Sequence, residues 1–210
     1  MKTIRIKNEQ NIQQIEHTVL VLGYFDGLHK GHQALFAEAR KIAAAKDLKI
    51  AVLTFPESPK LAFVRYQPSL MLHLTSPEDR LQQLENLGVD YLYLVDFTSQ
   101  FARNTAEQFF TKYISRLKAK AVIAGFDYHF GSDRRSAEDL EKLFEGQVII
   151  VPSVNFNGVK ISSTRIRETV LAGNVAESNQ LLGYSLSTSG IVVHGNARGR
   201  TIGYPTANLA

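Results

Sequence analysis

The residues with the clearest chemical potential lie in one glycine-rich segment near the N-terminus. Residues 23–32 have the sequence GYFDGLHKGH, with glycines at 23, 27 and 31 and histidines at 29 and 32. Glycine allows sharp turns and close approach of the backbone to a ligand, and imidazoles hydrogen-bond readily to phosphate oxygens. The segment precedes a helical pattern, and the N-terminus of a helix favours anions. We therefore predict a phosphate-binding segment, the histidine loop, in which His29 and His32 face the same anion.

Two other interpretations of the histidine loop stay open. A glycine-rich turn that carries two surface histidines would need no ligand at all. A zinc site would need ligands beyond the two histidines, and cysteine cannot supply them because the sequence contains none.

A second polar segment lies far downstream, at the start of another helical pattern. Residues 161–167 have the sequence ISSTRIR and form what we call the serine segment. The hydroxyls of Ser162, Ser163 and Thr164, with free backbone N–H groups, would make a second anion cradle. Arg167 adds a planar, permanently charged group that fits phosphate oxygens. Taken alone, an ordinary helix cap with surface arginines explains the segment better, but together with the histidine loop it favours a phosphate site.

Short apolar runs alternate with helical patterns along the chain. The pattern predicts strands at 18–24, 49–55, 90–95, 120–125 and 147–151, and helices at 31–46, 76–88, 104–118, 136–144, 162–173 and 175–182. This alternation is typical of an α/β fold, here with a five-stranded, mostly parallel sheet covered on both faces. Ligands in such folds bind beyond the carboxyl ends of the strands, where the histidine loop should lie.

Two stretches depart from this alternation. Pro56–Thr75 is long and irregular, and such loops are often lids or binding flaps. After residue 183 the sequence becomes small and polar, and a new strand is predicted at Ile191–His194. We therefore predict one domain over residues 1–183 and the unfinished start of a second over 184–210.

Composition narrows the choice of partner. The net charge is +4 and the pI is about 9.2, which permits an anionic ligand. Lysine and arginine do not form the long runs of nucleic-acid-binding arms, so nucleotides are favoured over polynucleotides. The first ten residues lack the apolar core of a signal peptide, and no apolar run approaches the ~20 residues of a membrane span. We expect a soluble, cytoplasmic protein.

The combined motifs resemble a known enzyme family. The histidine loop followed by the serine segment is similar to the Rossmann-like, HxGH-type nucleotidyltransferase domain of bacterial bifunctional riboflavin kinase/FMN adenylyltransferases, or FAD synthetases. Residues 125–131, GFDYHFG, resemble a further loop of that domain. Residues 199–208, GRTIGYPTAN, resemble the start of the riboflavin kinase domain, which implies an incomplete β-barrel at the C-terminus. The resemblance extends from about residue 15 to the end.

One segment departs from the family pattern. The family carries a Thr-Phe-x-Pro-His-Pro-like sequence after its second strand, whereas residues 54–60 here are TFPESPK. Ser58 stands where the histidine is expected, with Glu57 beside it. Lys60 is a candidate to replace the missing group as a point charge.

The resemblance implies a reaction and its ligands. The FMN phosphate would attack the α-phosphorus of ATP, with Mg²⁺ bridging phosphate oxygens, to give FAD and pyrophosphate. His29 and His32 would contact the ATP phosphates. Ser163 and Thr164, beside Ser162, would grip with Arg167 the β/γ end that becomes pyrophosphate.

The resemblance also assigns residues that shape the ligand sites. Gly23, Phe25, Asp26 and Gly31 would form the adenine-nucleotide cleft, and Asp127 would bind adenosine or ribose. Candidates to stack on the flavin ring are Phe63, Tyr66 and Tyr128.

The kinase-like tail receives separate expectations. Thr206 and Asn208 match the family's metal-nucleotide residues. The remainder of the kinase domain, including its catalytic carboxylate, would follow Ala210, so this chain alone should not phosphorylate riboflavin.

Three alternatives remain at this point. Another HxGH nucleotidyltransferase with a different phosphate acceptor would lack the kinase-like tail. A non-catalytic nucleotide-binding protein would bind ATP without turnover. An RNA-binding protein would show a steep salt dependence with oligonucleotides.

Overall fold

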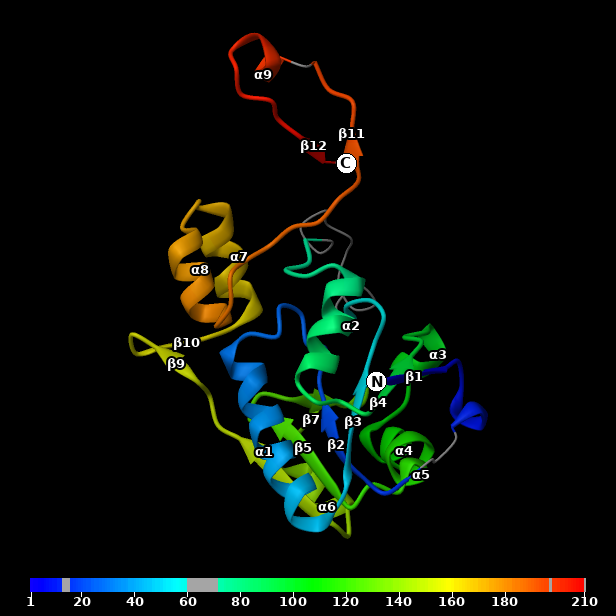
Figure 1. The fold of residues 1–210 in the computed structure, drawn as a ribbon. Coiled ribbons are helices and arrows are strands. Elements are labelled where there is room, and N and C mark those ends of the chain that lie inside the picture. Colours follow the sequence, from blue (N-terminus) through cyan, green and yellow to red (C-terminus); the bar gives the residue numbers. More distant parts are fainter. Residues whose placement is uncertain (13–15, 60–71, 197, 210) are drawn as a thin grey trace.

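Six strands form one parallel sheet at the centre of the molecule (Figure 1). The computed structural model describes residues 1–12, 16–59, 72–196 and 198–209. Every neighbouring pair in the sheet is parallel. In sheet order the strands are β1 (Lys2–Ile6), β4 (Tyr91–Val95), β3 (Lys49–Thr54), β2 (Thr18–Leu22), β5 (Ala121–Gly125) and β8 (Gln147–Val151). The chain runs outward from β2 in both directions, so a topological switch point lies between β2 and β5.

The sheet has one strand more than the sequence predicted. The missed strand is β1, which pairs only with β4 at the edge of the sheet. Lys2, Thr3 and Arg5 are exposed, and only Ile6 is fully buried. An edge strand with so much solvent contact shows no continuous apolar run, which is the signal that identified the inner strands.

Helices cover both faces, and side chains alternate between them along each strand. One face packs Val19 and Val21 of β2 under α1 (Lys30–Lys46) and α2 (Pro77–Asn86). The other packs Leu20 and Leu22 beneath a run of short helices. These are α3 (Ser99–Ala102), α4 (Ala106–Phe109), the π-helical turn η4 (Phe110–Ile114), α5 (Ser115–Leu117) and α6 (Asp139–Leu143).

Two of the predicted helices differ from the structure. The helix predicted at 104–118 is capped by Thr105 rather than Asn104, because Thr105 and Gln108 form a reciprocal capping box. The same stretch is divided by the π-helical turn. The helix predicted from Ser136 begins at Asp139, because Ser136 belongs to β7 (Arg135–Ser136) and pairs with β6 (His129–Phe130).

A third, smaller core joins the late helices to the main body. It consists of Leu74, Ile161, Ile166, Leu181 and Leu182. The helices are α7 (Ser163–Leu171) and α8 (Val175–Leu182), preceded by the hairpin of β9 (Asn155–Phe156) and β10 (Val159–Lys160). Gln33 in α1 donates to the carbonyl of Leu182 at 2.8 Å, which ties this unit to the start of α1.

The C-terminal tail lies away from the sheet in Figure 1. Its described elements are β11 (Val192–Val193), α9 (Arg198–Thr201) and β12 (Asn208–Leu209). β11 and β12 pair in antiparallel fashion. The barrel and the domain division at residue 183 stay predictions. At the other end of the chain a short 3₁₀ turn, η1 (Glu9–Asn11), follows β1. Among the described residues, no helix combines the length and apolar character needed to cross a bilayer.

The loop after β6 gives a stability prediction. Gly131 has a φ of +75°, and a Cβ there would lie 2.2 Å from the backbone nitrogen of Ala106. Gly88 has a φ of +86° with nothing within 4 Å, so it is a matched control. Gly88→Ala should cost only the left-handed penalty of ~1–2 kcal/mol, whereas Gly131→Ala should cost ~1–3 kcal/mol more for the added clash. Urea unfolding of both variants would measure this, and equal losses would contradict the close packing.

Candidate active site

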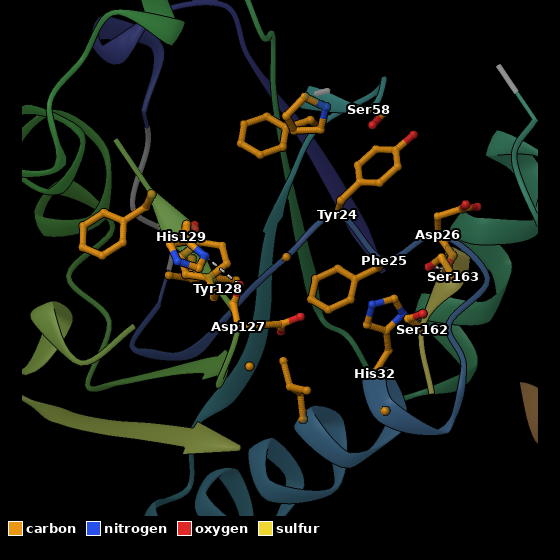
Figure 2. A pocket seen from close by; sticks show the side chains of 18 of the residues that line it. Tyr24, Phe25, Asp26, His32, Ser58, Asp127, Tyr128, His129, Ser162 and Ser163 are labelled. Atoms are coloured by element: carbon orange, nitrogen blue, oxygen red, sulfur yellow. Dashed lines mark hydrogen bonds between the residues drawn. The ribbon is translucent and has the colours of Figure 1, made fainter. Parts of the chain in front are cut away.

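A cavity of about 740 Å³ opens at the carboxyl ends of β2 and β5, at the switch point of the sheet. It brings together the histidine loop, the serine segment and the loop after β5 (Figure 2). The predicted residues that line it are Gly23, Phe25, Asp26, His29, Gly31, His32, Asp127, Ser162, Ser163, Thr164 and Arg167. Thr206 and Asn208 lie elsewhere, in a hollow of about 370 Å³ within the tail.

Close packing explains two glycines of the histidine loop. Phe25 is buried with a φ of +63°, and its ring occupies the space that a side chain at residue 23 would need. A Cβ at Gly23 would lie 2.6 Å from that ring, and a Cβ at Gly31 would lie 3.0 Å from the ring of His29. Phe25 also packs edge-on against His32, with ring centroids 5.2 Å apart. The glycines therefore allow the two histidines and Phe25 to share one small volume.

The two histidines stack on each other at the start of α1. Their ring centroids are 3.7 Å apart at an interplanar angle of 16°. His29 is the N-cap of α1, where its Nδ1 accepts the backbone N–H of His32 at 3.3 Å. An Nδ1 that accepts places the proton of a neutral imidazole on Nε2. His29 can therefore donate a hydrogen bond from Nε2.

Burial keeps both imidazoles neutral in the ligand-free protein. Desolvation lowers the pKa of His29 to about 4, although Asp26 and Asp127 act in the opposite direction. Desolvation also lowers the pKa of His32 well below its usual value, and the neighbouring His29 lowers it further. The pair thus presents hydrogen-bonding groups whose charge would depend on what binds beside them.

One atom of this pair has no partner. His32 Nδ1 is buried and makes no hydrogen bond within the described part of the chain. Buried polar atoms are almost always satisfied, so this nitrogen marks a point of incomplete hydrogen bonding at the start of α1.

Asp26 connects the histidine loop to the serine segment and to the residues before α2. Its carboxylate accepts from Nη2 of Arg167 and from the backbone N–H of Leu74, the latter at 2.9 Å. Its backbone carbonyl accepts from Oγ of Ser163 at 2.9 Å. Arg167 also donates from Nε to the carbonyl of Leu72 at 2.7 Å. Contacts with protein groups therefore hold Arg167 at the cavity.

Asp127 is paired with a cation that the sequence analysis did not identify. Lys160 forms a salt bridge with Asp127 and lies 4.6 Å from the ring centroid of Phe126. Lys160 directly precedes the serine segment, and a cation beside an anion-binding motif was a usable signal. Both partners are partly exposed, so the pair can rearrange when a ligand enters.

The far wall of the cavity is aromatic. It contains Phe55, Phe97, Phe101, Phe109, Tyr128 and Phe130. Phe101 packs edge-on against Phe55 and Phe97, with ring centroids 5.5 and 5.1 Å apart. Of the residues predicted to stack on a flavin, Tyr128 lines the cavity, whereas Phe63 and Tyr66 lie outside the described residues, as does Lys60.

The carboxylates of the cavity are poor candidates for a metal cage. Asp26 is engaged by Arg167 and Asp127 by Lys160. No group of three or more His, Cys, Asp or Glu side chains that could hold a metal occurs in the described residues. A divalent cation would fit here only if phosphate oxygens supplied most of its ligands, as is usual for Mg²⁺.

The parallel sheet and the cavity at its switch point define a Rossmann-like α/β domain, the layout of nucleotide-binding enzymes. The chain belongs to the FAD synthetase family, which matches residues 11–165. Residues 182–210 match the riboflavin kinase family.

The individual relatives agree with this family. The chain is 43% identical to a bifunctional riboflavin kinase/FMN adenylyltransferase from Listeria monocytogenes over 91% of its length, and 38% identical to one from Bacillus subtilis over 100%. It spans 62% of the Listeria relative and 67% of the Bacillus relative. A crystal structure of a Streptococcus pneumoniae protein, named a macrolide-efflux protein, is 57% identical with a TM-score of 0.94. The match covers 99% of this chain and 68% of that one.

The neutrality of His29 has a measurable consequence for stability. In the unfolded chain its pKa returns to about 6.5, so between pH 4 and 6.5 the unfolded state binds more protons. Stability from this group is therefore fully present above pH 6.5 and is lost as the pH falls towards 4. His29→Asn keeps a capping acceptor but removes the titration. From pH 7 to pH 4 the wild type should lose about 3 kcal/mol more unfolding free energy than the variant. Parallel pH profiles from denaturant titrations would contradict a neutral His29.

Proposed function

We propose that this chain is an FMN adenylyltransferase that forms FAD and pyrophosphate from FMN and ATP. One observation supports this proposal most strongly. Asp26 connects the loop of the stacked histidines, His29 and His32, to the N-terminus of α7, and all of them line one cavity. This arrangement offers neutral donors and a helix N-terminus to phosphate groups. Membership of the FAD synthetase family supports the same reaction.

The proposed chemistry is one in-line transfer. An oxygen of the FMN phosphate forms a bond to the α-phosphorus of ATP, while the bond from that phosphorus to the bridging α,β-oxygen breaks. The leaving group is pyrophosphate, and no covalent enzyme intermediate is needed. Because both reactants are anions, catalysis consists of holding them in line and offsetting their charge.

Each part of the cavity has a role in this scheme. Nε2 of His29 donates to an ATP phosphate oxygen, and the unpartnered Nδ1 of His32 lies in the same stacked pair. The hydroxyl of Thr164 and the N–H groups at the start of α7, that of Ser163 included, hold the end that leaves as pyrophosphate. Arg167 supplies a permanent charge next to them, and Ser162 caps the helix by accepting the N–H of Arg165 at 3.2 Å. An anion beside the histidines would favour their protonated forms.

The remaining ligand assignments follow the walls of the cavity. Gly23, Phe25, Asp26 and Gly31 shape the adenine-nucleotide side, and Asp127 binds the adenosine portion once Lys160 releases it. The aromatic wall that includes Phe55 and Tyr128 is the side proposed for the flavin ring. Mg²⁺, carried by the phosphates, would supply charge neutralisation at the transferred group.

The tail carries the second proposal. We assign residues 184–210 to the start of a riboflavin kinase domain, in which Thr206 and Asn208 provide neutral oxygens for a metal-bound nucleotide. Both residues line one hollow with Arg200 and His194. On this proposal the whole protein is bifunctional and cytoplasmic, and it binds neither nucleic acid nor membranes.

The acceptor test separates this reaction from its alternatives. Incubation of the chain with FMN, ATP and Mg²⁺ should give FAD and pyrophosphate in equal amounts by chromatography. Riboflavin in place of FMN should give no FAD, because riboflavin has no phosphate to attack the α-phosphorus of ATP. If the chain consumed ATP only with a different phosphate compound, that compound and not FMN would be the acceptor. If the chain bound ATP without turnover, the proposal of an enzymatic reaction would fail.

The histidine pair should carry a measurable share of the rate. His32→Ala removes a group proposed to act on the transferred phosphate, so kcat/KM should fall ~10²–10³-fold. His17→Ala is a matched control, because His17 is exposed and precedes β2 at the opposite end of the strand from the cavity. A folded His32→Ala protein with wild-type kcat/KM would remove this assignment.

A further inference from the structure

Two further histidines, His73 and His129, line the cavity without a role in the scheme above. Four of the six histidines face the cavity, namely His29, His32, His73 and His129. His73 immediately precedes Leu74, whose N–H holds Asp26. Its side chain is 23% exposed, so it is sheltered by the wall yet remains accessible.

Two neighbours orient the His73 ring. Nδ1 lies 3.3 Å from the hydroxyl of Tyr24, and Nε2 lies 3.6 Å from a carboxylate oxygen of Glu57. The second distance exceeds that of a proper hydrogen bond, so Nε2 can turn to a stronger acceptor without breaking one. Glu57 therefore attracts the ring to this wall but leaves the hydrogen-bonding capacity of Nε2 unused.

The His73 ring lies near Ser58, the residue that stands where the family pattern has a histidine. Ser58 lines the same cavity as His73, and Glu57 is its neighbour in sequence. The imidazole of His73 thus lies beside the very segment in which the family pattern carries a histidine. Ser58 itself contributes only a small side chain to that wall.

A buried cation lies beside the carboxylates of this wall. Arg80 is buried and lies 5.0 Å from the ring centroid of Tyr24. Its guanidinium donates to the carbonyls of Tyr24, Phe55 and Pro56, and no carboxylate among the described residues pairs with it. The guanidinium thus offsets the negative charge of Glu57 and Asp26, both of which act on Tyr24, so these carboxylates do not dominate the wall.

The wall also lies on the appropriate side for the second substrate. In Figure 2, Tyr24 and Phe25 separate Ser58 from His32. An in-line transfer places the attacking and leaving groups on opposite sides of the reacting phosphorus. If the histidine loop and α7 hold the ATP phosphates, the attacking phosphate approaches from another wall, and the Ser58 side provides donors for it.

We propose that His73 is a substrate-binding residue that donates from Nε2 to the phosphate of FMN. It supplies from residue 73 the imidazole that the family pattern places at residue 58. This inference rests on the proposed adenylyltransferase function. It concerns only the acceptor phosphate, and it assigns Tyr24 and Glu57 to orienting the ring.

The test compares FMN with riboflavin, which has the same ring but lacks the phosphate. Dissociation constants for both would be measured by flavin fluorescence quenching on this chain, with the ATP constant measured alongside. His73→Asn is the sharper variant, because its amide can keep the contact with Tyr24 while the Nε2 donor is lost. His73→Ala removes both contacts, and His17→Ala is the control.

The expected result is a selective loss. His73→Asn should weaken FMN binding ~10-fold while riboflavin and ATP binding change less than ~2-fold, since one hydrogen bond to a charged group is lost. Adding Ser58→His to His73→Ala should restore much of the FMN affinity, which a purely structural role of His73 would not explain.

Three outcomes would overturn the inference. These are an unchanged FMN constant, equal losses for FMN and riboflavin, and a loss confined to ATP. Failure of the proposed function is distinguishable, because it would appear in the wild type as an absence of FAD synthesis before any variant is compared.

Discussion

The site depends on one buried carboxylate. Asp26 is 3% exposed, and it meets the guanidinium of Arg167 and the N–H of Leu74 while its own carbonyl accepts from Ser163. These partners lie 48 to 141 residues away in sequence, so a single side chain fixes the histidine loop against α7 and the residues before α2. A buried ion pair adds little net stability but is costly to break from one side. Its role here is therefore geometric: it keeps the N-termini of two helices directed at one cavity.

The electrostatics of the cavity follow from this packing. His29 and His32 are stacked and desolvated, so they are neutral until an anion arrives. The permanent cations are held by protein groups, with Arg167 on Asp26 and Lys160 on Asp127. Because these two cations are paired, neither presents an unpaired buried charge to a ligand. In the proposed reaction, charge develops where a phosphate binds, and the preorganised donors then need little rearrangement.

Sequence reasoning succeeded where the signal was local and failed where it was not. The bounds of β8 and α8 were predicted to the residue, because a short apolar run and a periodic helix with clear ends determine them. Both the histidine loop and the serine segment were placed at helix starts from the sequence, and both line the one cavity. The edge strand β1 was missed because solvent exposure removes its apolar signature. His73 and Lys160 were missed because their importance arises from partners at positions 24 and 127, which no spacing rule connects to them.

The same anchoring supports the proposed role of His73. Arg80 holds the chain at Phe55 and Pro56, just before Ser58. Asp26 and Arg167 hold it at Leu74 and Leu72, on either side of His73. The two ends of the 56–75 segment are thus fixed against one wall, and Glu57 meets His73 there. Ser58 and His73 therefore line one cavity from the two ends of this segment. Because a ligand interacts with the position of an atom and not with its residue number, Ser58 is compatible with a complete site.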